Sequence, residues 1–89
     1  MLEQQLEIVN KLGLHARAAA KLVSTAASYG SKTTVSFAGQ DADAKSIMAV
    51  MMLAAAKGSQ ITLRCEGRDE AEAMQAIQSL IEDYFGEDE

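Results

Sequence analysis

Several residue types are scarce or missing in this chain, and each gap excludes a class of chemistry. The 89 residues include no proline and no tryptophan, two tyrosines, two phenylalanines, a single cysteine and a single histidine. A lone cysteine cannot form an internal disulfide, which fits a reducing cytoplasm. One histidine and one cysteine are also too few for a zinc site of ordinary ligand count, so we expect no bound metal.

Long apolar runs and nucleotide-binding glycine motifs are missing as well. The longest apolar run, residues 47–56, has ten residues and is too short to span a bilayer. Near the N-terminus, Glu3, Gln5 and Glu7 interrupt the apolar residues, so the sequence predicts neither a signal peptide nor membrane insertion. No GxGxxG, GxxxxGKS or GxxxxGKT pattern is present to hold a nucleotide. We therefore expect a cytoplasmic protein without a cofactor.

The composition that remains is that of a small folded protein. Hydrophobic residues make up 48% of the chain, which predicts one domain over residues 1–89 with a core mainly of Leu, Ile, Val, Met and Ala. The net charge is −5, but residues 1–65 carry seven basic and four acidic side chains, whereas residues 66–89 carry one and nine. This acidity argues against nucleic acid as a partner, while the N-terminal part can attract acidic proteins.

Hydrophobic periodicity predicts four strands and three helices. Alternating apolar residues indicate strands over residues 2–9, 32–37 and 60–66, with a weaker signal over residues 41–44. Apolar residues at helical spacing predict helices from about His15 to Gly30, from Ile47 to Lys57, and from Asp69 through Tyr84. We also expect a capping box formed by Asp69 and Glu72, and a solvated acidic end from Glu82 onward.

The order of these elements, β-α-β-β-α-β-α, predicts an α+β fold. Each helix has a single apolar stripe, which suits helices that cover one face of an antiparallel sheet. Cys65 shares the apolar side of its strand with Ile61 and Leu63, so it is expected to be an inert thiol in the core.

The only histidine lies in the stretch LGLHARAAAKLV, where a helix is expected to begin. If His15 is the N-cap, the free backbone amides of Ala16 and Arg17 face its ring, and the helix dipole there favours negative charge. Such a site suits phosphate. A phosphoryl group on a ring nitrogen would then be held by these amides and by the Arg17 guanidinium. From the pattern alone, a capping or surface histidine without chemical function is favoured over a phosphate site, and no serine spacing supports a hydrolase that uses His15 as its base.

A second feature is the apolar helix that follows Ser46. Serine is a preferred N-cap and needs no further function, but a phosphate on its hydroxyl would place about two negative charges beside any binding face. The side chains of Ile47, Met48, Met51 and Met52 are usually core residues. Because four of them on one short helix cannot all face the sheet, we expect an exposed patch of Ile47, Met48 and Met51.

Two segments together resemble a known family. GLHARAA at residues 13–19 and KSIMAVMMLAAAKG at residues 45–58 are similar to the two signatures of the HPr family, the phosphocarriers of the bacterial phosphoenolpyruvate-dependent phosphotransferase system. The resemblance covers essentially the whole chain. It implies an open-faced β-sandwich, a four-stranded antiparallel sheet with three helices on one face.

The resemblance also implies roles for individual residues. His15 would accept a phosphoryl group on Nδ1 from enzyme I and pass it to a IIA domain, with help from Arg17 and without independent turnover. Ser46 would be the target of an HPr kinase/phosphorylase in bacteria that have one. The protein would act as a monomer, and its successive partners would share a docking surface made of Ala20, Ile47, Met48 and Met51.

The chain departs from the common form of the family at position 18, where Ala18 replaces a proline. Proline fixes helical φ in the first turn, so Ala18 predicts a less rigid start of the helix with every phosphate-binding amide retained. Few basic residues lie along the expected partner face, and some members of the family serve nitrogen-related regulation instead of sugar uptake. The alternative function is a regulatory binding module that depends on phosphorylation of Ser46 and on the methionine patch, with His15 secondary.

Overall fold

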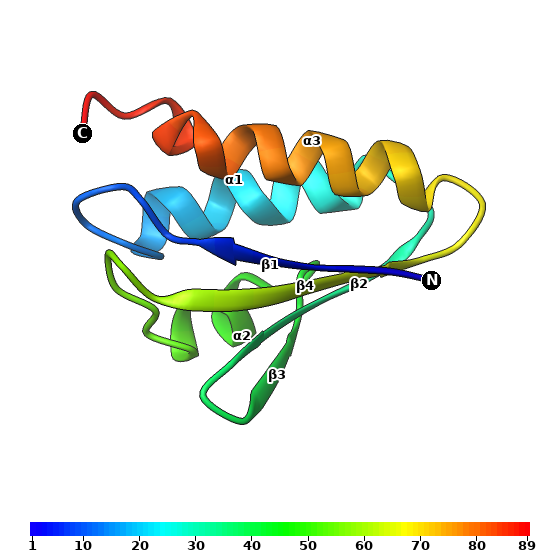
Figure 1. Ribbon diagram of the computed structural model, residues 1–89, viewed down its shortest axis with the longest axis horizontal. Helices are drawn as coiled ribbons and strands as arrows, with labels where there is room; N and C mark the ends of the chain where they lie inside the picture. Colours follow the sequence, from blue (N-terminus) through cyan, green and yellow to red (C-terminus); the bar gives the residue numbers. More distant parts are fainter.

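The chain folds into a four-stranded antiparallel sheet and three α-helices (Figure 1). The computed structural model describes residues 1–89. The predicted α+β class and element order are both confirmed. The elements are β1 (Leu2–Glu7), α1 (Ala16–Ala27), β2 (Lys32–Phe37), β3 (Gln40–Asp43), α2 (Ile47–Met52), β4 (Gln60–Glu66) and α3 (Glu70–Glu82), followed by the short 3-10 helix η1 (Tyr84–Gly86).

The strands lie in the order β1-β4-β2-β3, and every neighbouring pair is antiparallel. Strand β4 is central, with Ile61 opposite Leu6 of β1 and Leu63 opposite Val35 of β2. These side chains are buried beneath the helices. The other face is polar, and there Arg64 Nη2 donates to Ser36 Oγ at 2.8 Å. Alternation of buried and more exposed residues, clearest along the central strand β4, thus gives the open-faced arrangement.

The core lies between the sheet and the helices. Figure 1 shows α1 and α3 side by side along the sheet and α2 close to β3. Leu22 of α1 and Ile77 of α3 are fully buried, and aliphatic side chains supply most of the core, as the composition predicts. Cys65 is also fully buried, and burial raises the pKa of its thiol. None of the helices has the length and apolar character needed to cross a membrane.

Helix α2 is shorter than the periodicity predicts. The spacing predicts a helix over residues 47–57, but α2 ends at Met52 and Ala54 has a φ of 54°. The carbonyl of Ala55 instead accepts a hydrogen bond from the Leu14 amide at 2.9 Å. The run of alanines has high helix propensity, so a contact with a distant part of the chain overrides a local preference here.

The predicted capping box at the start of α3 does not form. Asp69 is the N-cap residue, but its side chain makes no capping hydrogen bond. Its carboxylate accepts hydrogen bonds from the backbone amides of Gly30 at 2.8 Å and Ser31 at 2.9 Å, and from the Ser31 hydroxyl. These contacts fasten the α1–β2 loop to α3. The expected end of the first helix at Gly30 is also wrong, because α1 ends at Ala27 with Ser28 as its C-cap.

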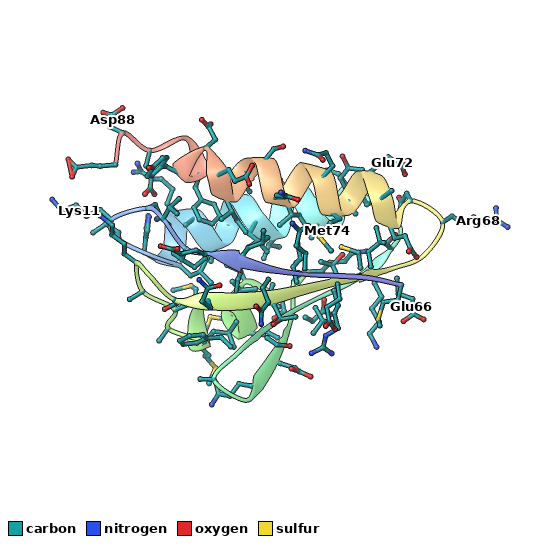
Figure 2. All side chains as sticks on the ribbon, viewed as in Figure 1. Lys11, Glu66, Arg68, Glu72, Met74 and Asp88 are labelled. Atoms are coloured by element: carbon teal, nitrogen blue, oxygen red, sulfur yellow. The ribbon has the colours of Figure 1, made fainter.

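The C-terminal residues do not form a solvated helix end, contrary to the sequence prediction. Helix α3 ends at Glu82, and Tyr84, expected on its apolar stripe, is 42% exposed. Positive φ angles of 58° at Tyr84 and 54° at Phe85 turn the chain, and Phe85 is fully buried. Figure 2 shows Asp88 and Lys11 at the same end of the molecule. The tail therefore returns to the loop that precedes α1.

Candidate functional site

His15 is the N-cap residue of α1, as the sequence predicts. Its backbone is extended, with φ −74° and ψ 177°, and its carbonyl accepts the Ala19 amide at 2.8 Å. The ring Nδ1 accepts a hydrogen bond from the Arg17 amide at 3.3 Å. The side chain is 27% exposed, so the ring lies at the positive end of the helix and within reach of solvent.

The loop before His15 is held in place by close backbone packing. Gly13 has a φ of 66°, and a Cβ at this position would lie 2.5 Å from the Ala55 oxygen. Leu14 is buried and donates its amide to the same oxygen. The Asn10 side-chain amide donates to the Gly13 carbonyl at 2.8 Å. Leu14 thus anchors the loop in the core and the next residue, His15, emerges at its surface.

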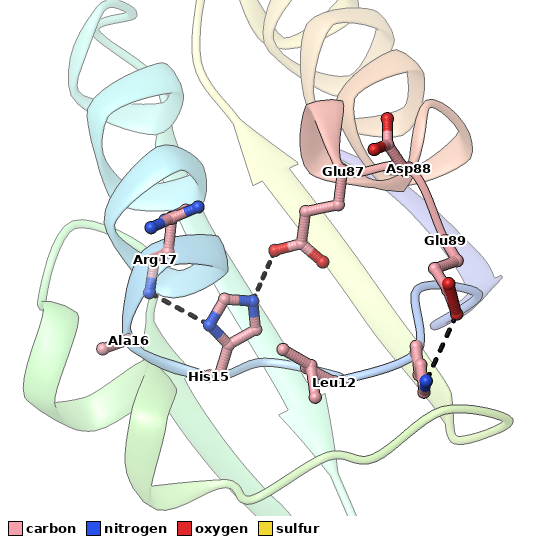
Figure 3. Close-up of a pocket in the computed structure, with 8 residues that line it drawn as sticks. Leu12, His15, Ala16, Arg17, Glu87, Asp88 and Glu89 are labelled. Carbon is pink, nitrogen blue, oxygen red and sulfur yellow. Dashed lines mark hydrogen bonds and ion pairs between the residues drawn. The ribbon is translucent and has the colours of Figure 1, made fainter.

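A carboxylate that the sequence analysis missed lies on the other side of the ring. Glu87 Oε2 is hydrogen bonded to His15 Nε2 (Figure 3). Glu87 Oε1 accepts a hydrogen bond from Asn10 Nδ2 at 3.1 Å. The hydrogen bonds from Asn10 and then from His15 lower the pKa of the Glu87 carboxyl, which keeps this group charged. A pairing between residues 15 and 87 has no local signal in the sequence.

The tail that carries Glu87 is fastened at two further points. Phe85 fills a fully buried position, and its carbonyl accepts a hydrogen bond from Lys21 Nζ at 2.6 Å. Lys21 belongs to α1, so the tail and the helix that His15 caps are directly linked. One signal in the sequence could have predicted this packing. Phe85 and Gly86, an apolar residue and a turn residue, directly follow the helical stripe, where a solvated end is expected.

A cleft of about 560 Å³ opens beside His15 (Figure 3). Its basic side chains are those of Lys11 and Arg17, and the exposed Arg17 follows directly on Ala16 in the first turn of α1. Its acidic residues are 87–89, of which Glu89 lies 3.3 Å from Lys11 in an exposed ion pair that contributes little to stability. Helix amides and a guanidinium suit an oxyanion such as a phosphoryl group, and they lie beside a ring nitrogen, Nδ1, that carries a lone pair.

Ser46 occupies a separate place, at the start of α2. It is the N-cap, as predicted, and its Oγ accepts the Ala49 amide at 3.3 Å. Its side chain does not line the cleft at His15. Of its neighbours, Ile47 is 39% exposed and Met48 is 64% exposed.

The exposed apolar surface of α2 differs from the predicted patch in one residue. Met51 is only half-buried and packs against the core, whereas Met52 is 74% exposed. Ala20 of α1 is exposed, as expected, and α1 and α2 are in contact. Leu12, in the loop before His15, is 65% exposed. Apolar side chains are therefore exposed on α1, on α2 and in the loop before His15.

Comparison with known proteins gives a consistent result. Residues 2–83 match the protein family described as "PTS HPr component phosphorylation site". The chain is 54% identical over 88 residues to the phosphocarrier protein HPr of Xylella fastidiosa strain Temecula1, covering 99% of both chains. It is also 54% identical over 89 residues to the HPr of Neisseria meningitidis strain MC58, covering both chains completely.

The same likeness extends to solved structures. The crystal structure of HPr-C-His from Thermoanaerobacter tengcongensis superposes with a TM-score of 0.96 at 45% identity, with complete coverage of both chains. Fold and sequence similarity thus define a phosphocarrier protein of the phosphotransferase system. Within that class, the chain belongs to the HPr family.

Proposed function

We propose that this chain, acting as one cytoplasmic domain and as a monomer, carries a phosphoryl group on His15. The group comes from phosphorylated enzyme I and goes to a IIA domain. The observation that carries the proposal is the position of Nδ1, which accepts the Arg17 amide at the N-terminus of α1 beside an open cleft. In the transfer, Nδ1 forms a bond to phosphorus while the donor's bond to phosphorus breaks.

The surroundings of Nδ1 supply the positioning and charge stabilisation that phosphoryl transfer needs. Once phosphorus occupies the Nδ1 lone pair, the Arg17 amide is free to donate to a phosphoryl oxygen, as is the neighbouring Ala16 amide in the first turn. The Arg17 guanidinium lines the same cleft and offsets the phosphoryl charge through charge-assisted hydrogen bonds. The carrier needs no cofactor for this step.

The exposed apolar residues beside the histidine support a shared docking face for enzyme I and the IIA domain. We place Ile47 and Met48 at its centre because both are exposed on α2. Ala20 adds an exposed small residue from α1, and Met51 contributes the part that the core leaves uncovered. Methionine side chains adapt to differently shaped partners, which suits a protein that must bind a donor and an acceptor in turn.

We further propose that Ser46 is a regulatory phosphorylation site in bacteria that have an HPr kinase/phosphorylase. Its hydroxyl lies at the N-terminus of α2, directly before the exposed Ile47 and Met48. A phosphate there would add about two negative charges next to the docking face and disfavour acidic partners.

Phosphorylation in a defined mixture tests the carrier function. The protein is incubated with enzyme I, phosphoenolpyruvate and Mg²⁺, and the expected product is an acid-labile, base-stable phosphate. The label should disappear in His15→Ala and persist in Ser46→Ala. Unchanged labelling of His15→Ala would overturn the proposal.

The second candidate is a regulatory binding module, which the position of Ser46 beside exposed apolar residues favours. It predicts that Ser46→Asp changes partner affinity while His15→Ala leaves every cellular phenotype intact. The carrier function predicts that His15→Ala abolishes phosphotransferase-dependent growth.

A further inference from the structure

The contact between Glu87 and His15 points to a role for the C-terminal tail. Glu87 lies outside residues 2–83, the part of the chain that matches the family. We propose that Glu87 is a positioning residue, which holds the His15 ring with its proton on Nε2 and its lone pair on Nδ1. The inference rests on the proposed function of His15 as the phosphoryl acceptor.

The partners of the two ring nitrogens define the tautomer. A backbone amide can only donate, so the Nδ1 atom that meets the Arg17 amide must carry a lone pair. An ionised carboxylate can only accept, so the Nε2 atom that meets Glu87 must carry the proton. The two contacts require the same neutral ring, in which Nδ1 is the free nucleophile.

Glu87 is itself fixed by a buried residue. Its side chain is 15% exposed, and a charged group with so little exposure is costly unless it is hydrogen bonded. Asn10, which is fully buried, donates from one nitrogen both to Glu87 and to the Gly13 carbonyl. Asn10 thus joins the tail to the loop that carries His15.

The neighbouring acidic residues have no comparable contacts. Asp88 lines the same cleft but forms no hydrogen bond or ion pair with His15. The contact of Glu89 is with Lys11, where both side chains are largely exposed. The chain therefore contains a natural control, because Asp88 and Glu87 are adjacent, carry the same charge and differ in their contact with the ring.

The carboxylate also has an effect during the reaction. As Nδ1 forms its bond to phosphorus, the ring gains positive charge, and the hydrogen bond from Nε2 to the Glu87 carboxylate becomes stronger. A histidine oriented and stabilised by a carboxylate in this way is a common arrangement in catalysis. The hydrogen bonds of Glu87 are to Asn10 and His15, and neither Ala20 nor any residue of α2 lines its cleft, so its effect should fall on the transfer step and not on docking.

NMR of the ring nitrogens tests the tautomer without any partner protein. In the parent chain with a neutral His15 ring, we expect the ring proton on Nε2. In Glu87→Ala we expect the fraction of the Nδ1–H form to rise several-fold. Glu87→Gln, which keeps an acceptor oxygen, should stay closer to the parent, and Asp88→Asn should match it. A Glu87→Ala spectrum identical to the parent would overturn the inference.

Kinetics provide the second readout. With phosphorylated enzyme I as donor, Glu87→Ala should lower the maximal rate of phosphoryl acceptance by about tenfold, the lower end of the loss seen for partners that orient metal-bound histidines. The KM for the donor should change by less than about twofold. A raised KM with an unchanged maximal rate would assign the tail to docking and overturn the inference. Absence of any phosphorylation in the parent chain would instead overturn the proposed function. The two failures can be distinguished because the NMR result does not depend on phosphoryl transfer.

Discussion

The backbone amide of Leu14 donates a hydrogen bond to the carbonyl oxygen of Ala55 at 2.9 Å. This bond joins the loop that presents His15 to the segment that follows α2. Because Leu14 is also buried, the histidine loop is fixed both to the core and to the segment directly after α2, the helix that carries exposed apolar residues. The position of the ring therefore depends on backbone packing at Gly13, where the two segments approach most closely.

Gly13→Ala should destabilise the fold more than an ordinary substitution in a turn. The new methyl group would lie 2.5 Å from the Ala55 oxygen, at a residue with φ 66°. Gly39→Ala is the matched control, because Gly39 has φ 82° with nothing within 4 Å of the added atom. We expect a loss of about 1 kcal/mol for the control and about 3 kcal/mol for Gly13→Ala, measured by urea unfolding. Equal losses would show that backbone conformation alone sets the cost.

Phe85→Ala should both destabilise the protein and release the tail. Phe85 is fully buried, and truncation of such a side chain costs about 3 kcal/mol or more. Tyr84→Ala changes a residue that is 42% exposed and should cost less than about 1 kcal/mol. Denaturant unfolding measures both variants. A small loss for Phe85→Ala would mean that the tail does not pack as described.

Acid should weaken the junction between α3 and the α1–β2 loop. Hydrogen bonds from the Ser31 hydroxyl and the Gly30 amide lower the pKa of the Asp69 carboxyl. A carboxyl with a lower pKa in the folded state stabilises the fold above its unfolded pKa, and this stabilisation is lost as the pH falls through the folded value. Stability should therefore decline below about pH 4, with a smaller slope in Asp69→Asn. Unfolding at a series of pH values checks this, and identical slopes would contradict it.

Met48→Asp should weaken docking without altering the histidine. Met48 is 64% exposed, so the substitution should cost little stability but place a charge on the proposed docking face. We expect the KM for phosphorylated enzyme I to rise about tenfold. Ala71→Asp puts the same charge on an exposed position of α3 and should leave the KM unchanged. Equal KM values for the two variants would show that the partner face lies elsewhere.

Local signals in the sequence predict most of the fold and the position of His15, but they do not predict the contact of His15 with Glu87. Strand alternation, the N-caps at His15 and Ser46 and the exposure of Met48 all follow from residues close together in the sequence. The errors arise where a distant residue determines the structure. The predicted helix does not extend through Ala55, whose carbonyl accepts a hydrogen bond from the Leu14 amide.

Two further errors have the same origin. The Asp69 carboxylate makes no capping hydrogen bond and instead accepts one from the Ser31 amide. No local sequence pattern connects Ser31 with Asp69. Glu87 lies in a stretch whose acidity indicates solvent exposure, and its partner His15 is far away in the chain. Pairings of this kind depend on how the helices and the tail pack on the sheet, which hydrophobic periodicity does not encode.

The location of Glu87 has a practical consequence for anyone who attaches an affinity tag or a fluorophore to this protein. Residues added after Glu89 would begin three positions from the carboxylate that orients the imidazole, directly after a residue that lines the cleft. Figure 1 shows the N-terminus at the opposite end of the molecule, where Met1 pairs with Glu70. Fusions for kinetic work are therefore better placed ahead of Met1, where they leave the imidazole and its surroundings undisturbed.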